Sequence, residues 1–141
     1  PVISSAASDV YKRQDIVSRA VTMASENGSS IVSSNDPVEA VSDAGVVYTD
    51  VFVSMGEESL DGKMDAFDGF QINEELVSHA DSDYLFMHCL PAHRGEEVTN
   101  GVIDSKNSVV FDQAENRMWA QMSLLTRMCN EAAWHTYNEL Y

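Results

Sequence analysis

The stretch DYLFMHCLP, residues 83–91, carries the strongest fold signal in the sequence. It contains four consecutive apolar or aromatic side chains, residues 84–87, of the kind that fills a buried strand. Pro91 lacks the backbone N–H that a strand ladder needs, so the strand is expected to end before it. His88 and Cys89 would therefore lie at the carboxyl end of a buried strand.

Similar short runs flank this stretch on both sides. β-Branched residues predict further strands at 29–34, 46–53 and 107–113. Helical periodicity and capping residues predict helices between and after the strands, at residues 15–28, 35–45, 73–80, 95–105 and 114–141. Because strands alternate with helices, the predicted fold class is α/β, with a parallel sheet of at most four strands flanked by helices.

Two of the predicted helices carry recognisable start signals. Asn35 or Asp36 is expected to cap the helix at 35–45, with Pro37 in its first turn, where a missing N–H does no harm. Asn73 is expected to cap the next helix in the same way.

The remaining segments give weaker signals. The first half of the strand at 46–53 is continuously apolar and is expected to be buried on both faces. Residues 55–70 are polar and glycine-containing, which predicts an irregular loop with one or two turns of helix. Residues 1–14 fit no periodic pattern and are expected to be a non-native or disordered leader, so the predicted domain covers residues 15–141.

The composition is that of a globular chain of single-domain size, with 141 residues, 44% of them hydrophobic and 22% charged. Its net charge of −15 repels phosphate backbones and anionic lipid, so neither nucleic acid nor a membrane is expected as a partner. No apolar run approaches the roughly 18 residues that a membrane span requires. Two cysteines and the absence of a recognisable secretory signal predict a reduced, cytoplasmic setting.

Polar residues follow three of the predicted strands, and the carboxyl ends of parallel strands meet at one edge of a sheet. These strand ends are residues 50–56, 88–91 and 112–117. Asp50 could hold an ammonium group there, although an aspartate that merely caps a loop is the more common case. Arg117 could bind an anion or a carbonyl group, or it could lie on a helix surface paired with Glu115 or with solvent.

The His88–Cys89 pair admits three interpretations. A thiolate close to His88, His93 and Arg94 would be a nucleophile. A cysteine at a strand end could equally fill a core. A zinc site would need four ligands, and His88, Cys89 and His93 offer three at unfavourable spacing, so no metal is expected.

Three segments together resemble the C-terminal half of the ornithine carbamoyltransferases: VYTDVFVSMGEE at 47–58, FMHCLPAHRGEEVTNGVID at 86–104 and SVVFDQAENR at 108–117. The HCLP tetrapeptide is weak by itself, but it is specific in register with an upstream DxxxSMG and a downstream AENR. The resemblance covers residues 15 to about 125. It implies the Rossmann-like ornithine-binding domain of that family.

Two related families resemble the chain less closely. Aspartate carbamoyltransferases have proline where Cys89 stands, and putrescine carbamoyltransferases share HCLP but lack the SMG of residues 54–56. The resemblance therefore implies L-ornithine as the amino-acid substrate, with a putrescine-type transferase as an alternative. A non-catalytic amino-acid-binding module that has kept Asp50 and the SMG segment is a second alternative.

The resemblance also implies roles for individual residues. Asp50 would bind the amino-acid end of ornithine, and Ser54 and Met55 would close over it as a mobile loop. Cys89 would lie beside the attacking δ-amine of ornithine.

On the other side of the implied site, Cys89, the Leu90 backbone and Arg117 would contact the carbamoyl group of carbamoyl phosphate. His88 would polarise the carbamoyl oxygen or orient that group. The implied reaction is an acyl transfer, in which a neutral amine attacks the carbonyl, a tetrahedral oxyanion forms and phosphate leaves to give citrulline. No covalent intermediate, cofactor or metal is implied. Cys89 is therefore interpreted as a binding and electrostatic residue.

Several features of the family do not occur in the sequence: the S-T-R-T phosphate loop, the H-P-x-Q motif, and the first βα unit of the ornithine domain with its asparagine ligand. We therefore expect an incomplete ornithine-binding domain without the carbamoyl-phosphate domain, inactive by itself. The resemblance implies that the last helix packs on that other domain, and that the full-length protein is a homotrimer or a higher homo-oligomer. The resemblance is compatible with a role in arginine biosynthesis and with one in arginine catabolism.

Overall fold

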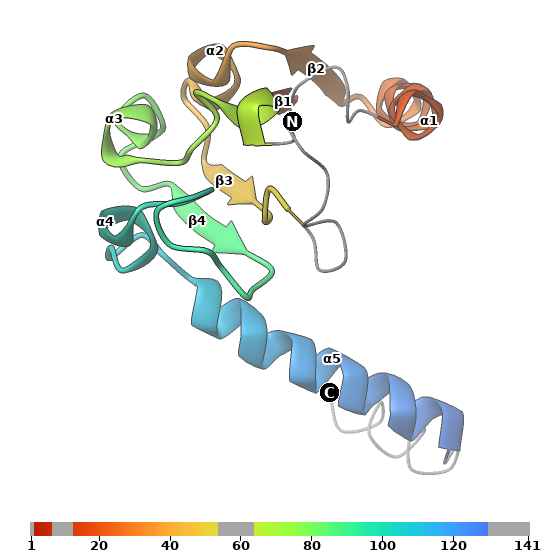
Figure 1. Cartoon of the computed structure of the whole chain (residues 1–141). Helices are drawn as coiled ribbons and strands as arrows, with labels where there is room; N and C mark the ends of the chain where they lie inside the picture. The colour runs from red at the N-terminus through yellow and green to blue at the C-terminus, as the bar shows by residue number, and fades with distance from the viewer. Residues whose placement is uncertain (1, 7–12, 54–63, 130–141) are drawn as a thin grey trace.

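The computed structural model describes residues 2–6, 13–53 and 64–129 (Figure 1). In chain order its elements are β1 (Val2–Ala6), α1 (Gln14–Glu26), β2 (Ser30–Ser34), α2 (Pro37–Val41), β3 (Val46–Thr49), the 3-10 helix η1 (Met64–Phe67), α3 (Glu74–Val77), β4 (Leu85–His88), α4 (Asn100–Ile103) and α5 (Val110–Cys129). Short strands and helices alternate along most of the chain, so the predicted α/β class is confirmed.

The described strands form two parallel pairs. β1 pairs with β2, and β3 pairs with β4. In the second pair Thr49 stands opposite His88, so both strands end at the same level. The parallel pairing confirms the prediction, although the described strands form two pairs rather than one sheet. Figure 1 shows α5 extending away from the body that the other elements form.

Strand β1 lies inside residues 1–14, the segment predicted to stay outside the fold. Its backbone pairs residue by residue with β2, from Val2 opposite Ser30 to Ala6 opposite Ser34. The prediction is therefore wrong for residues 2–6, because backbone pairing with a neighbouring strand needs no side-chain periodicity.

The helix starts follow from local hydrogen bonds. The Asp36 carboxylate accepts hydrogen bonds from the backbone N–H groups of Val38, at 2.9 Å, and Glu39, at 3.4 Å, and thereby caps α2. The Asn73 side chain caps α3 by accepting a hydrogen bond from the N–H of Leu76 at 2.9 Å. Both predicted caps are confirmed, and Asp36 rather than Asn35 fills the first position.

The core lies where β3 and β4 meet α3, α4 and the first turn of α5. Its most deeply buried apolar side chains belong to Phe86, Val98, Val102, Ile103 and Val110. Helix α1 contributes no buried residue to it. The site described below is thus supported by the second strand pair and its helices.

Strand β3 is buried on one face only. Val47 is 7% exposed, whereas Val46 and Tyr48 are each 53% exposed. The prediction of burial on both faces is therefore wrong, because alternate side chains of a strand point to opposite faces and only one face of β3 meets the core.

The strand predicted at 107–113 is reduced to a single bridge between Ser108 and Phe86. The N–H of Phe86 donates to the Asn107 carbonyl at 2.8 Å, and the N–H of Val109 donates to the Phe86 carbonyl at 3.0 Å. Helix α5 then begins at Val110, earlier than the predicted start at residue 114. The two β-branched valines misled the prediction: Val109 makes the last hydrogen bond to β4, and Val110 is buried in the core as the first residue of α5.

The other predicted elements exist but are shorter, with β3 ending at Thr49 and α4 spanning four residues. Helix α5 carries many exposed apolar side chains, including Phe111, Trp119, Leu124, Leu125 and Met128. Of the described helices, none combines the length and apolar character needed to cross a membrane.

Candidate functional site

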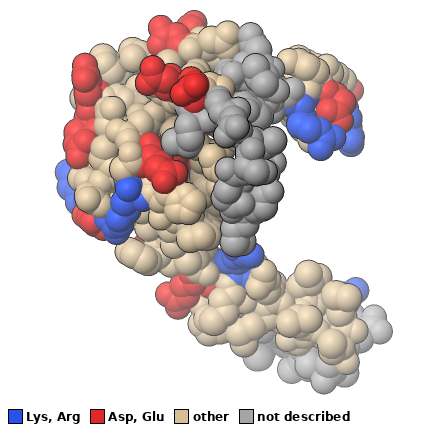
Figure 2. Space-filling model, in the orientation of Figure 1, with Lys and Arg blue, Asp and Glu red and all other residues tan. Residues whose placement is uncertain are grey.

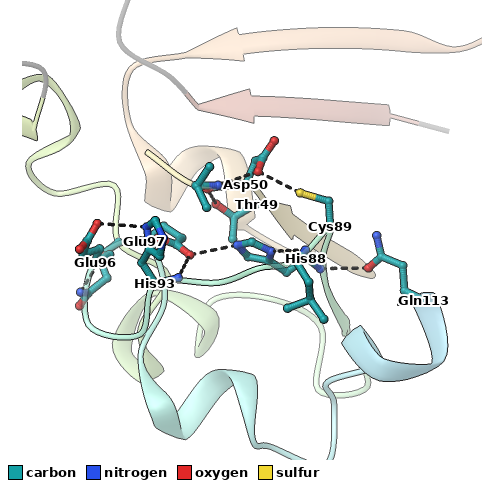
Figure 3. Close-up of polar contacts among 11 residues, drawn as sticks. Thr49, Asp50, His88, Cys89, His93, Glu96, Glu97 and Gln113 are labelled. Carbon is teal, nitrogen blue, oxygen red and sulfur yellow. Dashed lines mark hydrogen bonds and ion pairs between the residues drawn. The ribbon is translucent and has the colours of Figure 1, made fainter. Parts of the chain in front are cut away.

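The parallel register of β3 and β4 brings Asp50 and Cys89 together, because each residue directly follows the end of its strand. The Cys89 thiol donates a hydrogen bond to Asp50 Oδ1 at 2.9 Å, although 39 residues separate the two in sequence (Figure 3). Asp50 also accepts from the backbone N–H of Val51 at 2.7 Å. Two of the three strand ends expected to converge thus meet directly, and the third reaches them through Gln113, as described below.

The electrostatics of the pair favour a neutral thiol beside a charged carboxylate. The hydrogen bond from Cys89, the largest cause, holds the pKa of Asp50 below its ordinary value. Burial, followed by the hydrogen bond and charge of Asp50, raises the pKa of Cys89. A thiol with a raised pKa is a poor nucleophile at neutral pH, so the geometry favours binding and polarisation over covalent catalysis.

His88 is fully buried, and both of its ring nitrogens are engaged. Nδ1 accepts a hydrogen bond from the N–H of Leu90 at 2.8 Å, and Nε2 lies 3.1 Å from Glu97 Oε1. Since Nδ1 acts as an acceptor, the consistent assignment is the neutral ring that carries its hydrogen on Nε2 and donates it to Glu97.

The expected contact between His88 and a carbamoyl oxygen would require an open ring nitrogen. In the structure the ring instead supports the backbone turn that follows β4. Glu97, which sequence reasoning did not select, completes this support, because its Oε1 also accepts from the N–H of His93 at 2.6 Å. Its other oxygen, Oε2, is buried without a hydrogen-bond partner in the described part of the chain.

The turn itself has an unusual backbone. Leu90 has a φ of 52°, in the left-handed region that side-chain-bearing residues rarely adopt, and the Leu90–Pro91 peptide bond is cis. A left-handed non-glycine residue costs on the order of 1 kcal/mol or more, and such residues cluster at functional sites. The hydrogen bond from its N–H to His88 helps to hold Leu90 in place.

Gln113 is a second residue that sequence reasoning missed. It lies in the first turn of α5, and its Oε1 accepts from the N–H of His88 at 3.0 Å. Its Nε2 donates to the Tyr48 hydroxyl at 3.4 Å, so one amide joins α5 to both strands. The available signal was its position one helical turn before Arg117, a residue already selected.

Arg117 is exposed on α5 and lies on the same face of the helix as Gln113, four residues earlier. Glu115, considered above as its partner, instead accepts a hydrogen bond from the Trp119 indole at 3.2 Å. In the described part of the chain, Arg117 makes no hydrogen bond or ion pair with Asp50. Ser54 and Met55 lie outside the described residues.

A cavity of about 360 Å³ lies beside the carboxyl end of β3. Its lining is largely apolar and includes Asp50 and the stacked rings of Phe52 and Phe67, whose centroids are 4.5 Å apart. A carboxylate in the wall of an apolar cavity suits an aliphatic ligand with a cationic group.

Among the described residues, one group of side chains has the geometry to hold a metal ion. Ligand atoms of His93, Glu96 and Glu97 lie within 4.8 Å of one another. His93 Nδ1 lies 3.5 Å from Glu96 Oε2, and both side chains are about half exposed. Because Glu97 Oε1 already accepts two hydrogen bonds, a metal at that oxygen would compete with the support of the turn.

The surface charge is unevenly distributed. Figure 2 shows acidic side chains in several places over the body that α2, α3 and α4 cover, whereas basic side chains form small separate patches. Dianionic ligands such as phosphates are repelled by such a surface.

Comparison with protein families matches residues 2–128 to the family described as "Aspartate/ornithine carbamoyltransferase, Asp/Orn binding domain". A relative in Thermoplasma acidophilum, named "Ornithine carbamoyltransferase, catabolic", is 58% identical over 117 residues, which are 82% of this chain and 38% of the relative. One in Pyrococcus furiosus, named "Ornithine carbamoyltransferase, anabolic", is 55% identical over 113 residues, 79% of this chain and 36% of the relative.

The solved structure of the Pyrococcus furiosus ornithine carbamoyltransferase superposes with a TM-score of 0.80 at 51% identity. The superposition covers 87% of this chain and 40% of that one. The chain thus spans about two fifths of the length of the relatives it matches.

Proposed function

Because the chain belongs to the aspartate/ornithine carbamoyltransferase family, we propose that it forms the amino-acid-binding part of an enzyme that carbamoylates L-ornithine. The proposed reaction transfers the carbamoyl group of carbamoyl phosphate to the δ-amine and yields citrulline and phosphate. Relatives named anabolic and catabolic are both similar to this chain, so either direction of arginine metabolism is compatible with it.

The observation that carries this proposal is the thiol–carboxylate pair of Cys89 and Asp50 at the ends of two parallel strands. We assign Asp50 to the cationic amino group of ornithine, because its lowered pKa keeps it charged at neutral pH. Cys89 then lies beside the attacking δ-amine. The apolar cavity next to Asp50 supports an aliphatic substrate with a positive end.

Three further residues are assigned on the carbamoyl side. The Leu90 backbone, displayed by its left-handed conformation, and Arg117, on the face of α5 that carries Gln113, would contact the carbamoyl group. His88 is assigned as a positioning residue that holds this backbone. Ser54 and Met55 would close over ornithine, as the resemblance implies.

A complete site also has to neutralise the negative charge of the phosphate group of carbamoyl phosphate. With a net charge of −15 this chain is poorly suited to that task, so we propose that a further domain of the same protein supplies the phosphate-binding groups. We further propose that the whole enzyme is cytoplasmic, needs no cofactor, and assembles as a homotrimer or a higher homo-oligomer. We expect the isolated chain to form no citrulline from ornithine and carbamoyl phosphate.

A chimeric enzyme tests this function. Residues 15–125 of this chain replace their counterparts in the Thermoplasma acidophilum ornithine carbamoyltransferase, and citrulline formation is measured with ornithine and with putrescine. We expect turnover with ornithine and a loss of roughly 100-fold in kcat/KM for Asp50→Asn, because a charged hydrogen bond is worth about 2–3 kcal/mol.

Asp83→Asn provides the matched control, since this exposed carboxylate lies just before β4, at the opposite end of that strand from Cys89. It removes the same charge and should keep the parent kcat/KM. A folded, assembled chimera that carbamoylates putrescine in preference to ornithine, or one in which Asp50→Asn matches Asp83→Asn, would overturn the assignment.

A further inference from the structure

A buried carboxylate oxygen without a partner lies in the turn that follows β4. Glu97 is 0% exposed, and its Oε2 has no hydrogen-bond partner in the described part of the chain. The other oxygen, Oε1, lies 3.1 Å from His88 Nε2 and accepts from the His93 N–H at 2.6 Å. A buried carboxylate oxygen is costly unless a donor or a cation compensates it, so Oε2 points to a bound ion.

Two further ligand groups lie beside this carboxylate. Ligand atoms of His93, Glu96 and Glu97 lie within 4.8 Å of one another, and Figure 3 shows the three side chains close together. His93 Nδ1 is 3.5 Å from Glu96 Oε2. Two ligands that each bind zinc at about 2.0–2.1 Å in a tetrahedral arrangement lie about 3.3–3.4 Å apart. The imidazole and the second carboxylate therefore have nearly the spacing that a zinc ion requires.

The three residues belong to one tight turn. The N–H of Glu96 donates to the His93 carbonyl at 3.0 Å, and the N–H of Gly95 donates to the Val98 carbonyl at 2.8 Å. Gly95 has a φ of 90°, which a residue without a side chain adopts readily. The backbone is thus already folded so that His93 and Glu96 stand beside each other, and binding an ion needs little reorganisation.

We propose that His93, Glu96 and Glu97 bind one Zn²⁺ ion, through His93 Nδ1, one carboxylate oxygen of Glu96 and Oε2 of Glu97, with water as the fourth ligand. One imidazole and two carboxylates suit zinc, whereas Mg²⁺ prefers oxygen ligands alone. The hydrogen bonds to Oε1 then act as the outer contacts that orient a ligating carboxylate. The ion would hold the turn that supports the Leu90 backbone, and no step of the proposed reaction uses it.

This set differs from the one considered in the sequence, His88, Cys89 and His93. In the structure the nitrogens of His88 face Leu90 and Glu97, and Cys89 donates to Asp50. Only His93 of the earlier set remains available as a ligand, because 48% of its side chain is exposed.

The charges around the turn favour a cation. A cavity of about 680 Å³ borders Glu96 and is lined by two more carboxylates, Asp65 and Asp68, so an ion has a path of entry. Arg94, the cation next to His93 in the sequence, is engaged in an ion pair with Asp104. The net charge of −15 adds a general attraction for cations.

Isothermal titration calorimetry of the full chain with Zn²⁺ tests the proposal. The chain carries Cys89→Ser and Cys129→Ser, because both cysteines are free and a thiolate would bind zinc by itself. It is treated with a chelator and dialysed before the titration. We expect saturable binding of one Zn²⁺ per chain and no saturable binding of Mg²⁺ at the same concentrations.

Three variants remove one ligand each: His93→Gln, Glu96→Gln and Glu97→Gln. Each should weaken zinc binding by at least about 10-fold, since the loss of even an outer contact of a metal site costs about 10- to 100-fold in affinity. His79→Gln and Glu75→Gln make the same changes at exposed side chains near α3 and should bind zinc as the parent does. Glu96→Gln alters a half-exposed side chain and should keep the fold, whatever happens to Glu97→Gln.

Thermal unfolding followed by circular dichroism gives a second readout. Zn²⁺ should raise the unfolding temperature of the thiol-free parent, because an ion that binds only the folded chain stabilises it. It should not raise that of Glu96→Gln. No saturable zinc binding by the parent, an affinity of Glu96→Gln equal to that of the parent, or an equal loss in His79→Gln or Glu75→Gln would overturn the inference.

Discussion

Replacement of Glu97 by alanine is the sharpest test of how the candidate site is held together. Glu97 is fully buried, and its Oε1 accepts from His88 Nε2 at 3.1 Å and from the His93 N–H at 2.6 Å. Glu97→Ala leaves the buried His88 Nε2 and the part-buried His93 N–H without this acceptor.

The magnitude follows from these two donors. The buried donor left unsatisfied costs about 1–3 kcal/mol and the lost part-buried hydrogen bond about 0.5–1.5 kcal/mol, so the variant should lose about 2–4 kcal/mol of the free energy of unfolding. Glu97→Gln keeps the accepting oxygen and places an amide NH₂ where Oε2 now lies without a partner. It should cost only about 1–2 kcal/mol.

Urea unfolding followed by far-ultraviolet circular dichroism measures these differences. Glu96→Ala is the matched control: the same substitution one residue earlier, at a side chain that is 47% exposed and only pairs with His93. It should change the free energy of unfolding by less than about 1 kcal/mol. Equal losses for Glu96→Ala and Glu97→Ala, or for Glu97→Gln and Glu97→Ala, would refute this account of the turn.

Two other substitutions test the Asp50–Cys89 pair and the hydrophobic core around Phe86. Asp50→Asn should lower the pH midpoint of Cys89 alkylation by iodoacetamide in a chain carrying Cys129→Ser, because burial and then the hydrogen bond and charge of Asp50 raise the pKa of Cys89, and the substitution removes the charge; a midpoint that stays in place contradicts this. Since the pKa of Cys89 is raised in the folded state, the thiol's contribution to stability is complete below its unfolded pKa, about 8.5, and is lost as pH rises through the folded value. In Asp50→Asn the loss should be smaller and should end at lower pH, because the folded pKa lies closer to the unfolded one, as urea unfolding at several pH values will show. Phe86→Ala should lower the free energy of unfolding by about 3–5 kcal/mol or abolish cooperative unfolding, since Phe86 is 0% exposed. Phe111→Ala, at a side chain that is 70% exposed, should leave the free energy of unfolding near that of the parent. Similar losses for both variants would contradict the assigned core.

Local chemistry explains which elements could be predicted. The caps of α2 and α3 depend on Asp36 and Asn73, whose side chains bind N–H groups two or three residues away. The end of β4 before Pro91 depends on a missing N–H. Such features are encoded within a few neighbouring residues, so the sequence reveals them.

Features that depend on distant contacts were missed or misjudged. The sequence of residues 107–113 has the pattern of a strand. In the structure, however, Ser108 forms only one bridge, to Phe86 in β4, and Val110 begins helix α5. The hydrogen bond between His88 and Glu97 was missed because Glu97 is only one of the 23 acidic residues in the chain.

The sequence alone determined the α/β class, the strand that ends in His88 and Cys89, and the family resemblance, because these rest on short-range patterns and contiguous motifs. The tertiary structure decided which side chains meet. The register of β3 against β4 places Asp50 against Cys89 across 39 residues, and the first turn of α5 brings Gln113 to both strands. Hydrogen bonds require donor and acceptor within about 3 Å, and only the folded chain brings such distant residues that close.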